Sequence, residues 1–345
     1  MKLKDLLRKR AEEAFSLRGW RKPIVEDVFE RTIYIFPDEL RILNYFKKPL
    51  AAFNPGAMLV DNEIWVFPRL IFDYHYYTSS IGFFKIGIED LLNKRVNKPL
   101  ETKIILWPQM LWEFRGCEDA RAFSNKDKIL LLYTGFGYMV NESGKLGSIW
   151  VQGLAKLNYS LEVVERDYIK IVKGDETLIK MKDSAFIKTL DNKALILCRP
   201  SLDEMEICWS GVLDLKDKII YSDTMNPVIV NEKWEFKVGW STNTVRLSSN
   251  EYLVGWHGIV KRDYSYREGL ALFDENGELL AISNYLLSPQ GIIEGYGDRP
   301  HVIFGNGLIK YKDILIWIGG ISDYGIGFFK ANLDKVMEKL RWIKG

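Results

Sequence analysis

Two short patterns each recur five times along this chain, and this repetition constrains the fold more than any other feature. In the first, a Gly is followed by two apolar residues, a variable position and another apolar residue. The five copies are Gly82-FFKI, Gly153-LAKL, Gly211-VLDL, Gly269-LALF and Gly327-FFKA, whose glycines lie 71, 58, 58 and 58 residues apart. A fixed period of this kind predicts a fold built from repeated supersecondary units that pack on one another.

The second pattern is a polar pair followed by a short apolar run. Its copies are NEIWVFPR (62–69), DKILLLYT (127–134), NKALILCR (192–199), NEYLVGWH (250–257) and KDILIWIG (312–319). Their last residues lie 65, 65, 58 and 62 positions apart. Apolar runs of this length, bounded by Asn, Asp, Gly and Lys, indicate strands and are too short for helices.

The two patterns together predict an all-β fold, a five-bladed β-propeller. Five units with a period near 60 residues cover positions 40 to 335, which leaves room for four strands in each. Two packed sandwiches would not explain a count of five, and radial closure protects sheet edges. We expect helices only at the ends, over about 3–16 and 332–342. The predicted division is an N-terminal helix and lead-in segment at 1–39 and the propeller at 40–345.

Composition narrows the class of protein. The chain is 47% hydrophobic and 27% charged with a formal net charge of +2, which gives no reason to expect a nucleic-acid partner. The N-terminus has no apolar signal-peptide core, and no apolar run approaches the length of a membrane span. Cys117, Cys198 and Cys208 are odd in number and lack metal-ligand spacing, which predicts reduced thiols in a cytoplasmic protein. The chain has no HExxH, P-loop, GxSxG or CxxC motif.

Four of the five copies of the second pattern end in a polar residue, where a packing position would be apolar, and the fifth ends in Gly. These residues are Arg69, Thr134, Arg199, His257 and Gly319. Residues at one strand register point the same way in every blade, so in a propeller they would converge on the central channel. Two Arg and one His at one mouth predict an anion site. The alternative is that the arginines are only ion-paired at strand ends.

The densest polar stretch is GCEDARAF (116–123), directly before the second strand unit. In an extended strand its adjacent carboxylates point in opposite directions, so one could face the channel while the other binds Arg121. A turn or capping role for Asp119 is the alternative. Further polar candidates in or near other units are Asn54, Lys182, Asp183, Lys237, Tyr266 and Asp323.

These residues resemble glycoside hydrolase family 130, the β-mannoside phosphorylases and their relatives. The similarity follows the chain in order from about 50 to 337. Its motifs are FNPGA and Arg69, GCEDAR, KDSAFI, Arg199-Pro200, WHG, Tyr266, and HVIFGNG with GGISDYGIGFF. Two departures are Ala120, where the family has Pro, and Lys182, where it has an Arg that could bind an anion bidentately.

The resemblance implies a role for each candidate. Asp119 would be the sole catalytic acid of an inverting phosphorolysis that converts a β-mannoside to α-mannose 1-phosphate. The sugar would be held by Asn54, Arg69, Glu118, Lys237 and Asp323. Inorganic phosphate, the co-substrate, would be bound by Lys182, Arg199, His257 and Tyr266. The resemblance implies no other cofactor and no metal.

Phosphorolysis needs only an acid, because phosphate is itself the nucleophile, whereas hydrolysis usually needs a second carboxylate. A hydrolase on the same fold is therefore one alternative, with Glu118, Asp183 or Glu294 as base. A non-catalytic propeller that binds sugar is another. The expected partners are a small oligosaccharide and phosphate, with no nucleic acid and no membrane. A homo-oligomer stays open, since the N-terminal helix could pack on a partner subunit or on its own sheet.

Overall fold

Antiparallel strands make up most of the protein, for which the computed structural model describes residues 1–140, 144–203 and 205–343. Within these residues the main strands form five groups of four. The first group is β3 (Ala51–Val60), β4 (Glu63–Ile71), β5 (Ser79–Gly87) and β6 (Leu100–Leu106). The second is β7 (Gly116–Asn125), β8 (Lys128–Val140), β9 (Leu146–Leu157) and β10 (Val163–Tyr168). The third is β13 (Met181–Leu190), β14 (Lys193–Pro200), β15 (Cys208–Asp214) and β16 (Ile219–Tyr221).

The last two groups contain the C-terminal part of the chain. The fourth is β18 (Glu235–Arg246), β19 (Glu251–Val260), β20 (Tyr266–Asp274) and β21 (Leu279–Ile282). The fifth combines β22 (Ile303–Tyr311), β23 (Ile314–Ile321) and β24 (Gly325–Asn332) with β1 (Glu30–Ile35) from the N-terminal segment. The beginning and the end of the chain therefore share one sheet.

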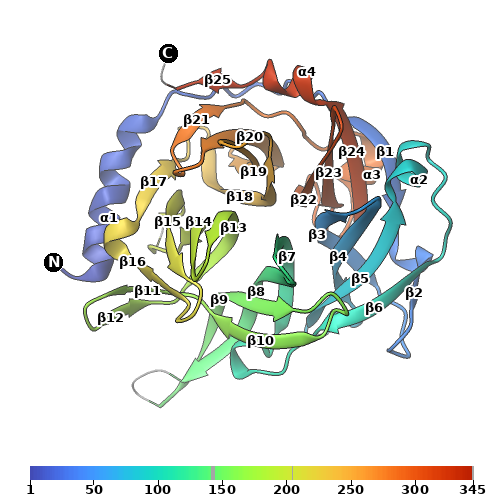
Figure 1. Ribbon diagram of the computed structural model, residues 1–345, viewed down its shortest axis with the longest axis horizontal. Helices are drawn as coiled ribbons and strands as arrows, with labels where there is room; N and C mark the ends of the chain where they lie inside the picture. The colour runs from blue at the N-terminus through green and yellow to red at the C-terminus, as the bar shows by residue number, and fades with distance from the viewer. Residues whose placement is uncertain (141–143, 204, 344–345) are drawn as a thin grey trace.

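The five groups are set around a common centre, as Figure 1 shows, with β3, β7, β13, β18 and β22 closest to it. We call these five the innermost strands. Single parallel bridges, Ser79 to Gly116 and Asn306 to Gly56, link neighbouring groups at the centre. The hydrophobic core is correspondingly divided into layers between groups. One buried cluster, for example, joins Phe67 and Ile81 of the first group to Leu131 and Val151 of the second, and another joins Ile316 and Ile318 of the fifth to Val66 of the first.

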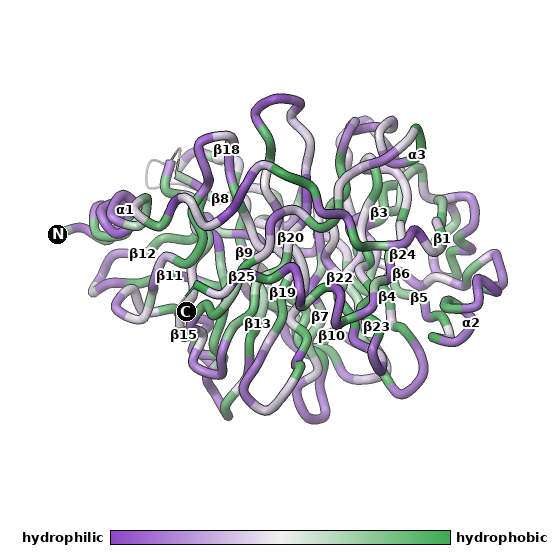
Figure 2. The backbone as a smooth tube through the Cα atoms, turned by 90° about the horizontal axis from the view of Figure 1, so that it is seen from above, coloured by the Kyte–Doolittle hydropathy of each residue, from purple (hydrophilic) through white to green (hydrophobic). Residues whose placement is uncertain are grey.

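The strands predicted from the two repeats are confirmed. The second pattern forms β4, β8, β14, β19 and β23, and the Gly-led pattern forms β5, β9, β15, β20 and β24. The polar ends of the second pattern pair with equivalent places on the innermost strands: Arg69 with Phe53, Thr134 with Glu118, Arg199 with Lys182, His257 with Gly239 and Gly319 with Gly305. Figure 2 shows the apolar residues running along the strands and the polar ones gathered in the loops.

Helices are short and peripheral, and in the described residues two of them lie away from the chain ends, where none was expected. They are α1 (Leu3–Ala14), α2 (Ile88–Leu92), α3 (Gly291–Gly295) and α4 (Leu333–Met337). Helix α1 packs on the third group through Leu3, Leu7 and Ala11, which are spaced to share one face. The second predicted helix was too long, because the chain leaves the helix after Met337 and Arg341–Trp342 pairs with β21 as β25. In the described ranges no helix is long and apolar enough to span a bilayer.

The remaining elements are small. The strands are β2 (Leu40–Ile42), β11 (Lys170–Lys173), β12 (Glu176–Leu178) and β17 (Asn226–Ile229), and the 3-10 turns are Phe15–Leu17, Pro37–Glu39, Leu111–Glu113 and Ser222–Thr224. The predicted division between 1–39 and 40–345 stays a prediction. Segment 1–39 does contribute β1 to the fifth group, so it is hydrogen-bonded to the chain's last strands.

Candidate active site

One pocket of about 210 Å³ is lined by all ten residues that the sequence singled out for catalysis, sugar or phosphate. Five of them form what we call the acid half, namely Asn54, Arg69, Glu118, Asp119 and Asp323. The cationic half contains Lys182, Arg199, Lys237, His257 and Tyr266. The pocket is also lined by Asp183, Arg299, Val302 and Phe304.

The regular strand pairing is interrupted in all five innermost strands, and in three of them the interruption lies at this pocket. The strand pairing skips Asn54 and Pro55 in β3, Asp119 and Ala120 in β7, and Asp183 and Ser184 in β13. Strands β18 and β22 are irregular between Trp240 and Thr244 and between Gly305 and Gly307. Asn54, Asp119 and Asp183 have φ values of 44°, 53° and 53°, in the left-handed region that Asn and Asp tolerate best among non-Gly residues. A bulge re-aims the side chains on either side of it, so it places these polar groups in the pocket.

The bulge in β7 corrects one expectation from the sequence. Strict alternation predicted that one of Glu118 and Asp119 would face the channel while the other bound Arg121. Instead both carboxylates contact Arg69, whose Nη2 lies 2.8 Å from Glu118 Oε1 and whose Nη1 lies 3.4 Å from Asp119 Oδ1. Because the strand is not regular at Asp119, the period of two fails at this position.

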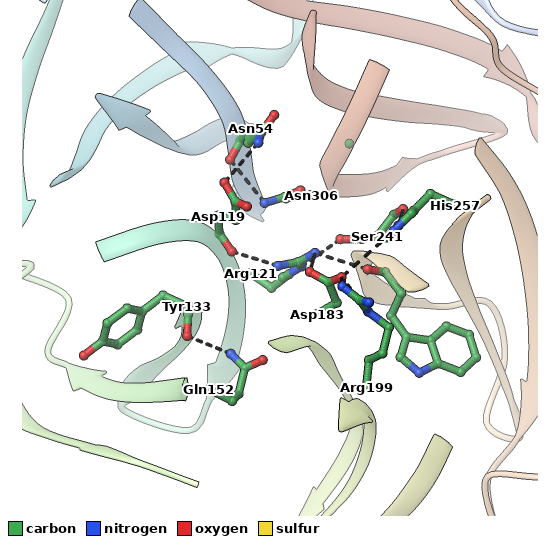
Figure 3. A network of polar contacts seen from close by, with 12 residues as sticks. Asn54, Asp119, Arg121, Tyr133, Gln152, Asp183, Arg199, Ser241, His257 and Asn306 are labelled. Carbon is green, nitrogen blue, oxygen red and sulfur yellow. Dashed lines mark hydrogen bonds and ion pairs between the residues drawn. The ribbon is translucent and has the colours of Figure 1, made fainter. Parts of the chain in front are cut away.

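Asp119 is held from two sides. The side-chain amide of Asn54 donates a hydrogen bond of 3.0 Å to Asp119 Oδ1, and Arg121 Nη1 donates one of 2.9 Å to the Asp119 backbone carbonyl (Figure 3). Arg121 is 1% exposed and also donates to the carbonyls of Trp240 and Ser241 in β18. Since its Nη2 also donates to Asp183 of β13, Arg121 ties the bulge of β7 to two other groups of strands.

Three carboxylates and one guanidinium group meet in the acid half. Burial raises the pKa of Glu118 although Arg69 opposes the shift. Burial acts to lower the pKa of Arg69, but Glu118 and Asp119 outweigh it, so the guanidinium stays charged. Burial raises the pKa of Asp323 to about 6, opposed by Arg69 and assisted by Asp119. Arg69 is therefore the counter-ion that this cluster of carboxylates shares.

Asp183 anchors the cationic half. Its Oδ2 accepts from Arg199 Nε at 2.9 Å and from Arg199 Nη2 at 2.6 Å, and its Oδ1 accepts from Arg121 Nη2 at 3.3 Å (Figure 3). Burial acts to raise the pKa of Asp183, but Arg199 and Arg121 hold it well below its usual range. A carboxylate tied to two arginines is a fixed anion, which suits it to orient Arg199 and not to exchange protons.

His257 and Tyr266 stack on each other and form one wall of the pocket. Burial and the neighbouring Arg199 hold the pKa of His257 well below its usual value although Asp183 opposes them, so its imidazole is neutral. Its Nδ1 lies 3.0 Å from Ser241 Oγ, and its ring stacks on Tyr266 with centroids 5.6 Å apart. Burial raises the pKa of Tyr266 to about 12, so the phenol keeps its proton and can donate it to an anion.

Lys237 and Arg299 complete the set of cations. Burial and the positive charges of Arg199 and Lys182 lower the pKa of Lys237 to about 8. The Arg299 guanidinium lies over the Tyr266 ring, 4.6 Å from its centroid. Sequence reasoning missed Arg299. The signal available was a single charged residue, in GDRP (297–300), in the connection before the innermost strand β22, whereas Glu118 and Asp119 lie within β7 itself.

Glu294, one of three bases considered for hydrolysis, does not line the pocket. Its carboxylate accepts from Arg31 Nε at 3.1 Å and from the Tyr34 hydroxyl at 2.7 Å, where it links β1 to helix α3. In the described part of the chain, no group of three or more His, Cys, Asp or Glu is arranged to hold a metal ion. The three cysteines are unpaired and buried.

Comparison with known proteins decides the family. The sequence model described as beta-1,4-mannooligosaccharide phosphorylase, that of glycoside hydrolase family 130, matches residues 20–342. The chain belongs to glycoside hydrolase family 130. The resemblance noted in the motifs is thereby confirmed, and so is the prediction of an enzyme from a family of glycoside phosphorylases that also has glycosidases.

Two proteins similar to this chain are β-1,2-mannobiose phosphorylases. The chain is 27% identical over 304 residues to the β-1,2-mannobiose phosphorylase of Thermoanaerobacter sp. (strain X514), covering 83% of this chain and 91% of the relative. A β-1,2-mannobiose phosphorylase of Listeria innocua, solved with β-1,2-mannobiose, shares the fold with a TM-score of 0.68 at 17% identity, over 88% of this chain and 96% of that one.

A further solved structure has a description that concerns hydrolysis. That description states that this family of mannoside phosphorylases contains glycoside hydrolases that target β-1,2 mannosidic linkages in Candida mannan. The structure matches at a TM-score of 0.60 and 14% identity, over 92% of this chain and 97% of that one. At these sequence identities, the solved structures show only that the fold is shared.

Proposed function

We propose that this protein catalyses inverting phosphorolysis of a β-mannoside, giving α-mannose 1-phosphate and the released sugar. The observation that carries the proposal is the division of one pocket into an acid half around Asp119 and a cationic half around Arg199. An acid next to an anion site is what phosphorolysis requires, because phosphate supplies the nucleophilic oxygen.

In the proposed reaction, a phosphate oxygen attacks the anomeric carbon from the face opposite the leaving group. The bond between the anomeric carbon and the glycosidic oxygen breaks, and its electron pair goes to that oxygen. Asp119 supplies the proton that the leaving oxygen takes up, in the family through the 3-hydroxyl of the mannose. Asn54 and Arg69, which both contact Asp119 Oδ1, orient the acid. Glu118, Lys237 and Asp323 are proposed to bind sugar hydroxyls with them.

Lys182, Arg199, His257 and Tyr266 are proposed to hold the phosphate, with no other cofactor. Arg199 is oriented by Asp183, Lys182 brings a second positive charge, and Tyr266 brings a protonated hydroxyl. The neutral His257 can exchange a hydrogen bond with phosphate without adding charge. Arg299 is a further cation at the same wall. This cluster combines charge with hydrogen-bond donors, the usual means of binding phosphate.

Hydrolysis is the competing reaction, since the family contains hydrolases, and it would need a second carboxylate to activate water. Of the three bases considered, Glu118 is bound to Arg69 and Asp183 to Arg121 and Arg199. Glu294 is outside the pocket. This supports phosphorolysis over hydrolysis.

We also propose that the fold is a five-bladed propeller. Each of the five groups of strands would be one blade, and the proposed active site would lie at their common centre.

The deciding experiment incubates the protein with β-1,2-mannobiose, the substrate named in two relatives, with and without inorganic phosphate. We expect mannose 1-phosphate and one mannose per turnover with phosphate, and almost no reaction without it. A panel of other β-mannosides would identify the preferred linkage. Equal rates in phosphate-free buffer, with free mannose as the sole product, would refute phosphorolysis in favour of hydrolysis.

A further inference from the structure

Glu206 interacts with two cations of the pocket without lining it: Arg199, from the proposed phosphate site, and Lys237, which lies beside Arg199 and is proposed to bind sugar. It lies between β14 and β15, in a connection fixed by the buried Leu202 and Ile207. Its Oε2 is ion-paired with Arg199 Nη1 and lies 3.4 Å from Lys237 Nζ. Burial acts to raise the pKa of Glu206, but Arg199 and Lys237 hold it below its usual value, so the side chain is an anion.

All three guanidinium nitrogens of Arg199 donate to carboxylates, so a ligand must compete for them. Its Nε and Nη2 both donate to Asp183, which is 3% exposed and held in place by Arg121. Its Nη1 donates to Glu206. An anion that binds Arg199 through Nη1, or that draws the ammonium group of Lys237 toward it, therefore competes with Glu206.

The two carboxylates differ in how easily they could give way. Asp183 is buried on a bulge and contacts two guanidinium groups, whereas the Glu206 side chain is 22% exposed and reaches the site from a loop. Exposed carboxylates regain hydration when they leave an ion pair, so the cost of releasing Glu206 is the smaller.

We propose that Glu206 is a built-in counter-anion that phosphate displaces from Arg199 and Lys237, and that it thereby sets the affinity of the site for phosphate. This inference rests on the proposed function. In the unliganded site, Glu206 neutralises part of the positive charge of Arg199 and Lys237. The free energy needed to break these contacts reduces the free energy of phosphate binding. The apparent dissociation constant equals the intrinsic one divided by the fraction of molecules in which Glu206 has left the two cations.

The test is the substitution Glu206→Gln, which keeps the shape and removes the charge. Binding of inorganic phosphate is measured by isothermal titration calorimetry at pH 6.5, which is below the pKa of about 8 that burial and the neighbouring cations give Lys237. We expect the dissociation constant for phosphate to fall about tenfold or more. The KM for phosphate in phosphorolysis should fall with it, while the KM for the mannoside changes less.

The matched control is Asp203→Asn, in the same connection. It removes the same charge, but Asp203 is ion-paired with Lys4 and Arg8 of helix α1 and not with the pocket. We expect its phosphate affinity to equal that of the parent protein, which separates direct competition from a general change in charge. Circular dichroism melts of both variants check the fold, which Glu206→Gln should keep because Arg199 retains Asp183.

Each outcome has a meaning. Tighter phosphate binding in Glu206→Gln alone supports the inference, including the case in which the parent protein binds no phosphate and the variant does. Unchanged or weaker binding in Glu206→Gln, with phosphate-dependent turnover in the parent, refutes the counter-anion and leaves phosphorolysis intact. Phosphate binding to neither protein overturns both proposals.

Discussion

Asp119 depends on its neighbours for position, because it sits on a bulge and not in a regular strand. Its backbone is held by Arg121 and its carboxylate by Asn54 and Arg69. These contacts fix one oxygen of the carboxylate while the fold supplies the pocket around it. The chemistry assigned to Asp119 can therefore be tested separately from its structural role.

Replacing Asp119 with Asn keeps the hydrogen-bonding shape but removes the transferable proton. We expect kcat for phosphorolysis of β-1,2-mannobiose to fall about 10²- to 10⁴-fold with a nearly unchanged melting temperature. The control is Asp127→Asn, an exposed carboxylate in the turn at the opposite end of β7, which should keep full activity. Near-normal turnover of Asp119→Asn would remove this residue from the mechanism.

Asp323 has a folded-state pKa of about 6 against a reference value of 3.8, and burial is the main cause. The folded protein therefore binds this proton more tightly than the unfolded chain. Its contribution to the free energy of unfolding falls as pH rises from about 4 to 6 and stays unfavourable above that. Asp323→Asn removes the penalty.

We thus expect Asp323→Asn, without ligands, to melt about 2–4 °C higher than the parent protein at pH 7.5 and at nearly the same temperature at pH 4. Differential scanning calorimetry across this range measures the difference. Parallel pH profiles for the two proteins would show that Asp323 does not carry the raised pKa. The same substitution should weaken mannoside binding if Asp323 holds a sugar hydroxyl.

At the scale of the element, the bulges in the innermost strands bring neighbouring sheets into contact at the pocket. Gly56, directly after the bulge of β3, lies against the bulge of β7. A Cβ atom added at Gly56 would be 2.4 Å from the carbonyl oxygen of Ala120, the residue after Asp119. Only a residue without a side chain permits this approach of two backbones.

We expect Gly56→Ala to separate β3 from β7, with a loss of about 1–3 kcal/mol in the free energy of unfolding. Because Asn54 and Asp119 meet at this point, kcat should also fall by at least tenfold. The matched control is Gly147→Ala in β9, where the nearest atom to an added Cβ is 3.9 Å away. Urea unfolding and activity assays would test both variants, and an equal effect of the two substitutions would contradict the explanation.

For the whole molecule, the N-terminal segment connects the ends of the chain. Strand β1 pairs with β24, and Arg21 forms a buried ion pair with Glu235 of β18 at 2.6 Å. The two side chains are 3% and 0% exposed. Loss of one partner would leave a buried charge without compensation, which costs about 3–5 kcal/mol.

A chain that lacks residues 1–35 loses β1, Arg21 and α1 together, and we expect it to aggregate or to unfold. A chain that lacks only residues 1–17 retains β1 and Arg21, so it should remain folded with a lower melting temperature. Size-exclusion chromatography and thermal melts compare the two. A monodisperse protein with the parental melting temperature after removal of 1–35 would show that β1 is dispensable.

The repeat was readable from the sequence because it depends on local patterns. The polar pair and apolar run of NKALILCR, and the Gly-led unit at Gly211, determine strand and turn through interactions a few residues apart. Their fivefold recurrence gave the second and third strands of every group. The resemblance also named the ten pocket residues in advance, and each of them does line the pocket.

Other features were decided only by the tertiary structure. The sequence alone placed Glu118 and Asp119 on opposite faces and gave Arg121 to one of them, because regular alternation was assumed. The bulge at Asp119, the pairing of Arg121 with Asp183, and the contact of Glu206 with Arg199 and Lys237 join residues from different sheets. Local periodicity fixes which residues are strands, but contacts across the centre depend on how the five sheets pack, and no spacing along the chain encodes that.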